Sequence, residues 1–207
     1  MEKIIIIGGG GHSKVIQNII RRDYKEYEII GYVDQQNKNL NIPYLGKENA
    51  VFNFDNKNFK LVIGIGQIDE GIKRKELIKT FLEKGYNFLT IVSKKAIIAD
   101  SSIIGEGTVV FDNVVVNVDC KIGDFCILNT GCIVEHDCYI GNFVHLSPGV
   151  VLSGGVKIGD NCFLGSGSVV KHYTTICDNV IIGAGSVVVK NITEKGTFVG
   201  IPAKKIK

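Results

Sequence analysis

The sequence predicts an α/β domain with a parallel sheet, followed by a parallel β-helix. Residues 1–92 alternate short apolar runs with amphipathic stretches, which is the pattern of strands and helices in a parallel sheet. Residues 97–192 instead repeat one pattern every six residues, which fits neither a helix nor a single long strand. We therefore divide the chain into domains at 1–92 and 93–192, with a C-terminal tail at 193–207.

The N-terminal domain contains three clear strand candidates and two helix candidates. KIIIIG is a strand that runs into GGGGHSKV, which begins a helix extending to about Arg22. EIIGYVD is a second strand ending at Asp34, and LVIGIG, at residues 61–66, is a third. Residues 69–84 are expected to form a helix, and NFLTIV is expected to form a further strand.

The glycines before the first helix predict a phosphate-binding site. GGGGHS resembles the dinucleotide fingerprint GxGxxG, with Ser13 at the last glycine, and Asp34 stands where an acid would hold ribose hydroxyls. Free N–H groups at a helix start bind any phosphate, so a nucleotide-sugar diphosphate suits the motif as well as NAD does. The domain is too short for the half that holds nicotinamide. His12 either lies near the ligand or packs at the helix start.

Large aliphatic residues occupy every sixth position of the second domain. Steps of six from Ile98 to Val188 give sixteen positions, all Ile, Leu or Val, without an insertion. The residue four positions later is Ser, Thr, Val or Cys in fifteen of them, Ile192 being the exception. Three such hexads close one triangular coil, and stacked coils pair their backbones at about 4.8 Å.

The cysteines follow the same repeat. Five of the six stand at the small-residue position, namely Cys120, Cys126, Cys132, Cys138 and Cys162. No CxxC motif occurs and no histidine stands in register with them, so we interpret them as reduced packing residues rather than metal ligands or disulfide partners. With no export signal recognisable at the N-terminus, a cytoplasmic protein is expected.

Composition also argues against two kinds of partner. The net charge is +3 and basic residues are scattered among acids, so there is no basic stripe for nucleic acid. No apolar run reaches the roughly eighteen residues that a membrane span requires. Small molecules are therefore the expected partners.

Two of the four histidines fall within IVEHDCYIGNFVH, at His136 and His145, and neither occupies an inward aliphatic position. Nine residues are half a coil, so the two lie on different sides of one prism, and packing about a three-fold axis could bring them together at a subunit boundary. A histidine base suits acetyl transfer from a thioester, and a carboxylate such as Asp137 can orient it. Because neighbours on a flat strand face opposite ways, Asp137 reaches His136 only where the chain turns, or from another subunit.

Nearly the whole chain resembles the sialic acid O-acetyltransferase and sugar N-acetyltransferase family of hexapeptide-repeat acyltransferases. The motifs that carry the resemblance are GGGGHSK, YVDQ, IGIGQ, ILNTGCIVEHDCYIGNFVHLSPGVVLSGGVKIGDNCFLGSGSVV and EKGTFVGIPAKKIK. The chain is most similar to bacillosamine-pathway enzymes, which acetylate the 4-amine of a UDP-linked 4-amino-4,6-dideoxy sugar. The resemblance implies a Rossmann-like domain, a left-handed β-helix, a homotrimer with sites between subunits, acetyl-CoA as co-substrate and no metal.

The resemblance also implies roles for individual residues. His136 would be the general base and Asp137, commonly Glu in the family, would raise its basicity. Acetyl-CoA would be bound by His145, Ser166 and Ala184, with the Gly154 backbone stabilising the oxyanion. The nucleotide sugar would be held by Gly10, Gly11, His12, Asp34, Gln35, Gly66 and Asn129, where Gln35 replaces a second acid found in some relatives.

Other interpretations stay open at this point. The enzyme could O-acetylate sialic acid or N-acetylate GDP-perosamine, and a non-catalytic nucleotide-binding sensor or scaffold has the same repeat. Acetyl-CoA turnover separates the enzymes from the scaffold. Cys138 lies two residues from His136, so a covalent acetyl-cysteine is a further route, although its repeat position favours packing.

Overall fold

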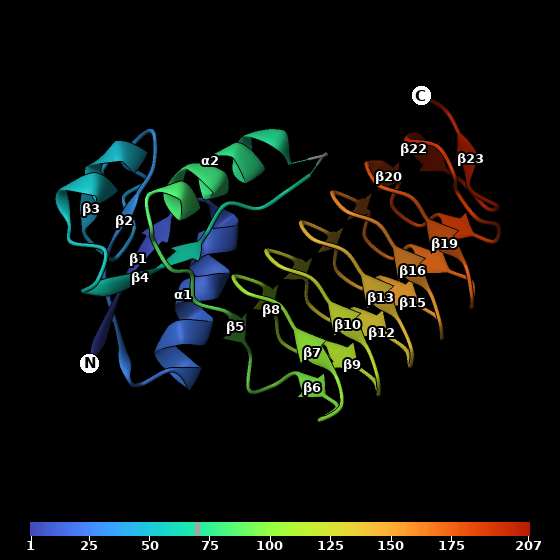
Figure 1. The fold of residues 1–207 in the computed structure, drawn as a ribbon, viewed down its shortest axis with the longest axis horizontal. Helices are drawn as coiled ribbons and strands as arrows, with labels where there is room; N and C mark the ends of the chain where they lie inside the picture. The colour runs from blue at the N-terminus through green and yellow to red at the C-terminus, as the bar shows by residue number, and fades with distance from the viewer. Residues whose placement is uncertain (69–70) are drawn as a thin grey trace. The chain divides into compact units, whose positions relative to one another are not determined.

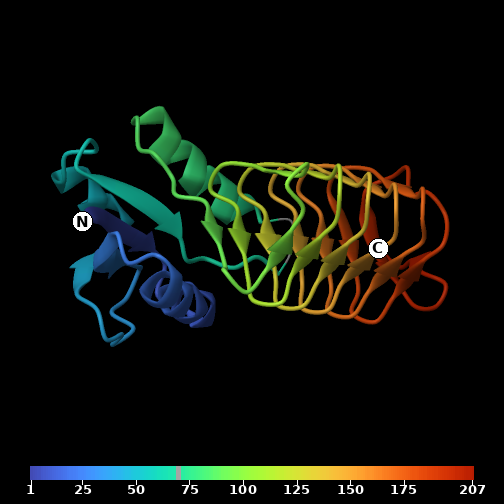
Figure 2. The same cartoon turned by 90° about the horizontal axis from the view of Figure 1, so that it is seen from below.

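The computed structural model describes residues 1–68 and 71–207, which form two compact units. One unit comprises Met1–Gly66 and Ile72–Ile91, and the other comprises Gln67–Gly71 and Val92–Lys207. Figures 1 and 2 show the first as a small sheet with helices and the second as a stack of coils. No helix among the described residues is long and apolar enough to cross a membrane.

The first unit is a four-stranded parallel sheet in the order β3-β2-β1-β4. Its elements are β1 (Glu2–Ile7), α1 (Gly11–Asp23), β2 (Tyr27–Val33), β3 (Tyr44–Gly46), the 3-10 helix η1 (Glu48–Asn53), β4 (Phe59–Ile63) and α2 (Ile72–Glu83). The isoleucines at 4–7 are fully buried because β1 is central and α1 and α2 lie on opposite sides of the sheet, as Figure 2 shows. This architecture confirms the predicted α/β domain.

Three details of this unit differ from the sequence-based expectation. NFLTIV adds no strand to the sheet, because Phe88 makes a single bridge to Leu61 and Ile91–Val92 (β5) pairs within the β-helix instead. β3 and η1 were not predicted, since each is short and has no clear periodicity. The helix expected over residues 69–84 is α2, and residues 69 and 70 lie outside the described residues.

The second unit is a left-handed parallel β-helix of about six turns. Each hexad between Ile98 and Val188 ends a short strand, and the strands stack into three faces. The β6 face holds β6 (Ile97–Ile98), β9 (Val115–Val116), β12 (Ile133–Val134), β15 (Val151–Leu152), β18 (Val169–Val170) and β21 (Val187–Val188). The β7 face holds β7 (Ile103–Ile104), β10 (Lys121–Ile122), β13 (Tyr139–Ile140), β16 (Lys157–Ile158) and β19 (Thr175–Ile176).

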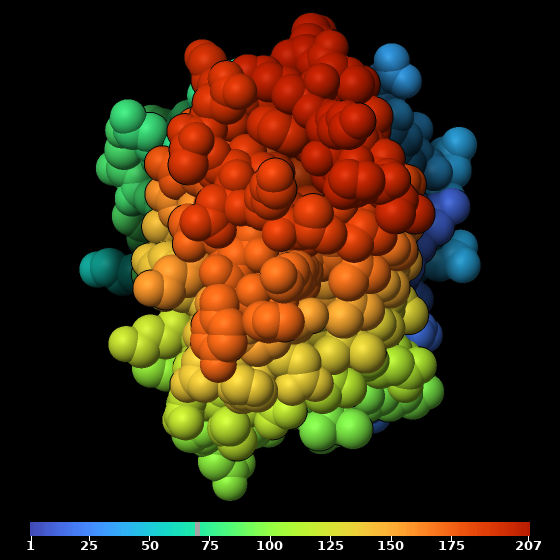
Figure 3. All heavy atoms as spheres, turned by 90° about the vertical axis from the view of Figure 1, so that its right-hand side faces the viewer, coloured from blue at the N-terminus to red at the C-terminus, as the bar shows by residue number. Residues whose placement is uncertain are grey.

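The β8 face begins with β5 and ends with strands of the tail. After β5 it holds β8 (Val109–Val110), β11 (Ile127–Leu128), β14 (His145–Leu146), β17 (Phe163–Leu164), β20 (Val180–Ile182), β22 (Gly196–Val199) and β23 (Lys204–Lys205). The coil therefore extends beyond the perfect repeat at both ends. Figure 3 looks onto the C-terminal coils and the tail.

Several of the small residues four after an aliphatic form side-chain hydrogen bonds in addition to packing. The hydroxyl of Thr108 donates to the Gly123 carbonyl at 2.8 Å, fifteen residues further along the chain. The buried thiols of Cys120 and Cys126 donate in the same way to carbonyls at 3.0 and 3.1 Å. Burial raises the pKa of Cys132 and Cys162 to about 12. None of the cysteines forms a disulfide, and four of them, Cys120, Cys126, Cys138 and Cys162, are structural donors in the repeat.

Candidate active site

His136 and Asp137 form a corner of the coil between β12 and β13. Asp137 has a φ of +60°, in the left-handed region, so the backbone turns sharply at this position. The turn lets the Asp137 carboxylate accept a hydrogen bond from Nδ1 of His136 at 2.8 Å. Asp137 therefore reaches His136 within one chain, because the two residues stand at a turn and not on a flat strand. Both side chains are exposed, by 47% and 62%.

The contact with Asp137 sets the electrostatics of His136. The hydrogen bond that His136 donates to Asp137, followed by the charges of Asp137 and Glu135, raises the pKa of His136 above its ordinary value. Nδ1 carries the hydrogen that faces the carboxylate, so Nε2 is the nitrogen left to accept a proton. The pair has the arrangement of an oriented general base.

Replacing Asp137 with asparagine is expected to move the acidic limb of the kcat/KM profile toward lower pH. A base works when it is unprotonated, so the rate rises as pH passes upward through the pKa of His136. Removing the carboxylate lowers that pKa toward the ordinary histidine value of about 6.5. The plateau should also fall, because the ring loses its orienting partner. The ionisation of the substrate affects the unaltered enzyme and Asp137→Asn equally. An acidic limb at the same pH in both would therefore contradict the role of Asp137 in raising the pKa of His136.

The imidazole of His136 lies against Gly154, one coil further along. A Cβ added at Gly154 would come within 2.6 Å of both Cε1 and Nε2 of the ring. The backbone N–H of Gly155 also donates to the His136 carbonyl at 2.8 Å, which holds the two corners in register. Glycine at 154 therefore leaves room for the proton-accepting edge of the histidine.

Gly154→Ala is expected to lower kcat at least tenfold with little loss of stability. The methyl group meets the far end of an exposed side chain, so the ring rotates away and the backbone stays in place. A displacement of this size at a base commonly costs that much rate. Comparison of kcat with the midpoint of thermal unfolding checks it, and normal kcat in the folded variant would show that the ring position is unimportant.

His145 and Asn129 form a second group, which lies on and beside the β8 face. Nδ1 of His145 contacts the carbonyl oxygen of Gln67 at 2.5 Å, and Nε2 lies 3.2 Å from the Asn129 amide nitrogen. Asn129 Oδ1 accepts from the N–H of Thr130, which fixes the amide orientation. Nε2 of His145 therefore accepts, Nδ1 donates, and the ring is only 7% exposed. Both nitrogens form hydrogen bonds within the chain, and the contact of His145 with acetyl-CoA stays a prediction.

Ser166 and Ala184 lie one coil apart on the edge between the β8 face and the β6 face, here called the β8–β6 edge. Both are exposed. The glycines that follow them, Gly167 and Gly185, have positive φ, and a Cβ at either would meet nothing within 4 Å. This edge thus offers open backbone along which an extended chain can lie, which fits the pantetheine arm of acetyl-CoA.

The N-terminal candidates gather at the carboxyl end of the parallel sheet. His12 follows β1, and its Cβ would lie 3.6 Å from a Cβ placed on Gly66, which follows β4. Asp34 follows β2 and accepts the Gly9 N–H at 2.8 Å, so one carboxylate oxygen holds the glycine loop itself. Gln35 donates to Glu48. The sheet therefore brings these residues to one edge, where ligands of open α/β sheets bind.

Gly10 and Gly11 stand at the start of α1 in ordinary conformations. A Cβ at either position would meet nothing within 4 Å, and Gly10 makes no side-chain cap for the helix. Neither the fold nor the backbone angle of Gly10 requires glycine. The space and the free N–H groups at this helix start suit a phosphate.

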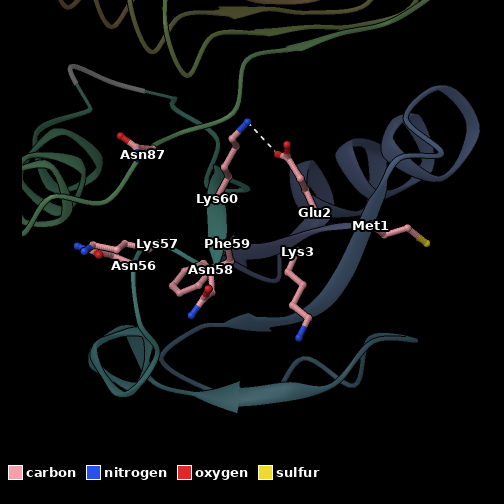
Figure 4. A pocket seen from close by; sticks show the side chains of 9 residues that line it. All are labelled: Met1, Glu2, Lys3, Asn56, Lys57, Asn58, Phe59, Lys60 and Asn87. Atoms are coloured by element: carbon pink, nitrogen blue, oxygen red, sulfur yellow. Dashed lines mark ion pairs between the residues drawn. The ribbon is translucent and has the colours of Figure 1, made fainter.

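A cavity of about 530 Å³ lies at the other end of the same sheet. It is lined by residues 1–3, 56–60 and 87. Figure 4 shows that Lys3, Lys57 and Lys60 point in different directions, and Lys60 pairs with Glu2 at 2.9 Å. The amines do not converge on one position, so this cavity lacks the features of an anion site. Among the described residues, no group of three His, Cys, Asp or Glu side chains could hold a metal ion.

Comparison with known proteins matches the N-terminal part of the chain and the repeat to two different family models. Residues 3–81 match the family model described as the PglD N-terminal domain, and residues 119–154 and 155–190 match the bacterial transferase hexapeptide model. The acetyltransferase domain of PglB from Neisseria gonorrhoeae is 32% identical over 100% of both chains, with a TM-score of 0.92. The same domain has a structure in complex with acetyl coenzyme A, at 31% identity over 99% of both chains and a TM-score of 0.90.

PerB from Caulobacter crescentus, in complex with CoA and GDP-perosamine, is 33% identical to this chain. The match covers 99% of this chain and 97% of PerB, with a TM-score of 0.92. The similarity is thus spread over both units and not confined to the repeat. The chain belongs to the family of acetyl-CoA-dependent sugar N-acetyltransferases in which a PglD N-terminal domain precedes a hexapeptide-repeat β-helix.

Proposed function

We propose that this protein transfers an acetyl group from acetyl-CoA to the 4-amine of a UDP-linked 4-amino-4,6-dideoxy sugar. The observation that carries the proposal is the His136–Asp137 contact at 2.8 Å, with the opposite edge of the ring over Gly154. The UDP-linked substrate is proposed because the sequence motifs resemble those of bacillosamine-pathway enzymes, which act on a UDP-linked sugar. The PerB complex makes GDP-perosamine the second candidate.

His136 acts as general base in a direct transfer. The sugar ammonium first releases one proton to solvent. The neutral nitrogen then attacks the thioester carbonyl carbon and forms the C–N bond, and Nε2 of His136 takes the second proton from that nitrogen. The Gly154 N–H, which has no acceptor among the described residues, donates to the oxyanion. The C–S bond then breaks, and the imidazolium returns its proton to the departing CoA thiolate.

A covalent route through Cys138 has little support. The Cys138 side chain is 1% exposed and its thiol donates to the Ser153 carbonyl at 3.4 Å. Hydrogen bonding with Cys120, together with burial, raises the pKa of Cys138. A buried thiol with a raised pKa is a poor nucleophile.

The acceptor is proposed to be an amine and not a hydroxyl. The edge between the β6 face and the β7 face is here called the β6–β7 edge. At the corner of His136 and at the two corners before it, every charged side chain apart from His136 itself is acidic. These acids are Asp100, Asp119, Glu135 and Asp137. An ammonium group is attracted to such an edge before it loses its proton, whereas a neutral hydroxyl gains nothing from it. This favours N-acetylation over O-acetylation of sialic acid.

The nucleotide diphosphate is proposed to bind the N–H groups of Gly10 and Gly11, near His12 and Gly66. Gly11→Leu is therefore expected to raise the KM for the nucleotide sugar roughly tenfold or more, by filling the phosphate space, and to leave the KM for acetyl-CoA unchanged. A Cβ at Gly11 would meet nothing within 4 Å, so the fold should persist. Val15→Leu, at an exposed position on α1, is the control. Equal KM values in Gly11→Leu and the unaltered enzyme would place the diphosphate elsewhere.

The active unit is proposed to be a trimer in which neighbouring subunits complete each site. His136 and Gly154 lie on the β6–β7 edge, whereas Asn129, Ser166 and Ala184 lie on the β8–β6 edge. These two edges border the same face, the β6 face. If three β6 faces turn toward a common axis, the β8–β6 edge of one chain meets the β6–β7 edge of the next, and acetyl-CoA lies between them.

The outer surface of the β6 face supports this assembly. The first residue of each strand points outward, and on this face all six are apolar and β-branched. They are Ile97, Val115, Ile133, Val151, Val169 and Val187. The β7 face carries Lys121, Lys157 and Thr175 at equivalent positions. A continuous apolar stripe on one face marks a protein interface.

Thiol release from acetyl-CoA across a panel of UDP-, GDP- and dTDP-linked 4-amino sugars and free sialic acid tests the function. Turnover with the UDP-linked sugar is expected. Turnover with GDP-perosamine alone would make GDP-perosamine the substrate in place of the UDP-linked sugar. Turnover only with sialic acid would refute the amine and the diphosphate site together. The cysteines form no disulfide, and acetyl-CoA is supplied inside the cell, so we propose that the reaction takes place in the cytoplasm.

A further inference from the structure

The β6–β7 edge continues past the proposed base in strict register. The Gly155 N–H donates to the His136 carbonyl at 2.8 Å, and the Tyr173 N–H donates to the Gly154 carbonyl at 3.0 Å. His136, Gly154 and His172 are therefore stacked, with about 4.8 Å between coils. Lys190 stands at the next corner, since β21 pairs with β18. The edge thus provides a row of positions that leads from the base toward the C-terminus.

Tyr173 is an unusual residue at such a corner. It has a φ of +56° and is 71% exposed. A bulky residue in the left-handed region is strained by about 1 kcal/mol or more, and such residues cluster at functional sites. Phe125 and Phe143 share the conformation, but they stack on each other at 5.4 Å and Phe125 is buried, so packing explains them. The Tyr173 ring also packs, over Gly155 and against His172, but the residue remains largely exposed, so the ring presents a free aromatic surface.

The ring of Tyr173 lies beside the space above the base. A Cβ on Gly155 would come within 2.4 Å of the ring, so Tyr173 leans along the edge toward the coil of His136. The His172 ring meets it edge to face, with 5.7 Å between centroids. Gly154 and Gly155 contribute no side chain of their own to the edge, and the rings of His136 and Tyr173 cover them. This stretch of the edge, with His136 at one end and Tyr173 at the other, is here called the gap.

The charge of the edge changes sign at this gap. The corners up to His136 carry acids, whereas the two corners beyond Gly155 carry Lys171 and Lys190 and no acid. Tyr173 and Lys190 each share a coil with a residue that is proposed to bind acetyl-CoA. Ser166 shares its coil with Tyr173, and Ala184 shares its coil with Lys190. An assembly about an axis parallel to the coil keeps these heights aligned between subunits.

We infer that Tyr173 and Lys190 form a second wall of the acetyl-CoA site, opposite Ser166 and Ala184 of a neighbouring subunit. The Tyr173 ring packs on the apolar part of the pantetheine arm, and the Lys190 ammonium pairs with a phosphate of CoA. The inference rests on the proposed function and extends it to residues on the far side of the gap. It also predicts the direction of the pantetheine arm. The thioester would lie at the acidic half of the edge and the phosphates at the basic half.

Calorimetric titration of the intact protein with CoA tests the inference without relying on turnover. Tyr173→Ala should raise the Kd for CoA about tenfold, as expected for the loss of one aromatic contact, while Tyr173→Phe should bind normally. Lys190→Gln should raise the Kd for CoA several-fold and weaken its salt dependence. Acetyl-pantetheine, which lacks the nucleotide, should be affected as a substrate by Tyr173→Ala and not by Lys190→Gln.

Tyr139→Ala is the matched control, because Tyr139 is an exposed tyrosine on the β7 face. If both variants bind CoA as tightly as the unaltered protein, the second wall does not exist. A changed KM for the nucleotide sugar with an unchanged Kd for CoA would assign Tyr173 to the acceptor and overturn the inference. Failure of the unaltered protein to bind CoA would instead refute the proposed function itself.

Discussion

His136→Ala is expected to lower kcat by roughly 10²- to 10⁴-fold, which is the usual contribution of a positioned general base. The side chain is 47% exposed and stands at a corner of the coil, so its removal leaves no core cavity and the fold should persist. CoA and the nucleotide sugar should still bind, because neither depends on Nε2. Pre-steady-state measurement of acetyl transfer, together with binding of each substrate, separates the chemical step from affinity.

Two controls make this result specific to the base. Cys138→Ala, two residues away in the buried ladder, should retain most of its kcat, because direct transfer uses no thiol. His172→Ala removes an exposed histidine from the same edge and should leave the acidic limb of the pH profile in place. Near-normal turnover by a folded His136→Ala trimer would show that another group takes the proton.

Val151→Glu is expected to dissociate the trimer and abolish activity. Val151 lies at the centre of the apolar stripe on the β6 face, so three carboxylates would come together near the axis without partners. The β-helix core should remain intact, because this side chain points away from it. Sedimentation velocity should show a monomer with native circular dichroism, and the monomer should release no thiol from acetyl-CoA.

Lys157→Glu is the matched control for assembly. It introduces the same side chain in the same coil but on the β7 face, where Lys157 is exposed. This variant should remain trimeric and active. A Val151→Glu monomer with full activity would mean that one chain contains a complete site, and the division of the site between two edges would be wrong.

The β-helix could be predicted closely from the sequence because its signal is repeated sixteen times. Each aliphatic position between Ile98 and Val188 is the last residue of a short strand, as a coil of three hexads requires. The limits of the coil were harder to predict. On the β8 face, β5 precedes the strict repeat and β22 follows it, and a short apolar run such as NFLTIV suits either unit.

Turn geometry explains most of what the sequence left open at the site. Spacing alone could not show whether Asp137 reaches His136, because that depends on a left-handed φ at an aspartate. The burial of His145 was not predictable either, since its partner Gln67 is seventy-eight residues away in sequence. Tyr173 could have been found by stepping two coils from Asp137, but an aromatic residue in a turn gives no functional signal by itself.

Thiol release from acetyl-CoA with a UDP-linked 4-amino-4,6-dideoxy sugar, followed by mass analysis of the nucleotide sugar, decides whether this protein is an N-acetyltransferase of that sugar. The account predicts one thiol released for each acetyl group gained, with the acetyl group on the 4-amine and the rate strongly reduced in His136→Ala. Absence of acetylated sugar from an intact trimer supplied with UDP-, GDP- and dTDP-linked amino sugars would contradict it.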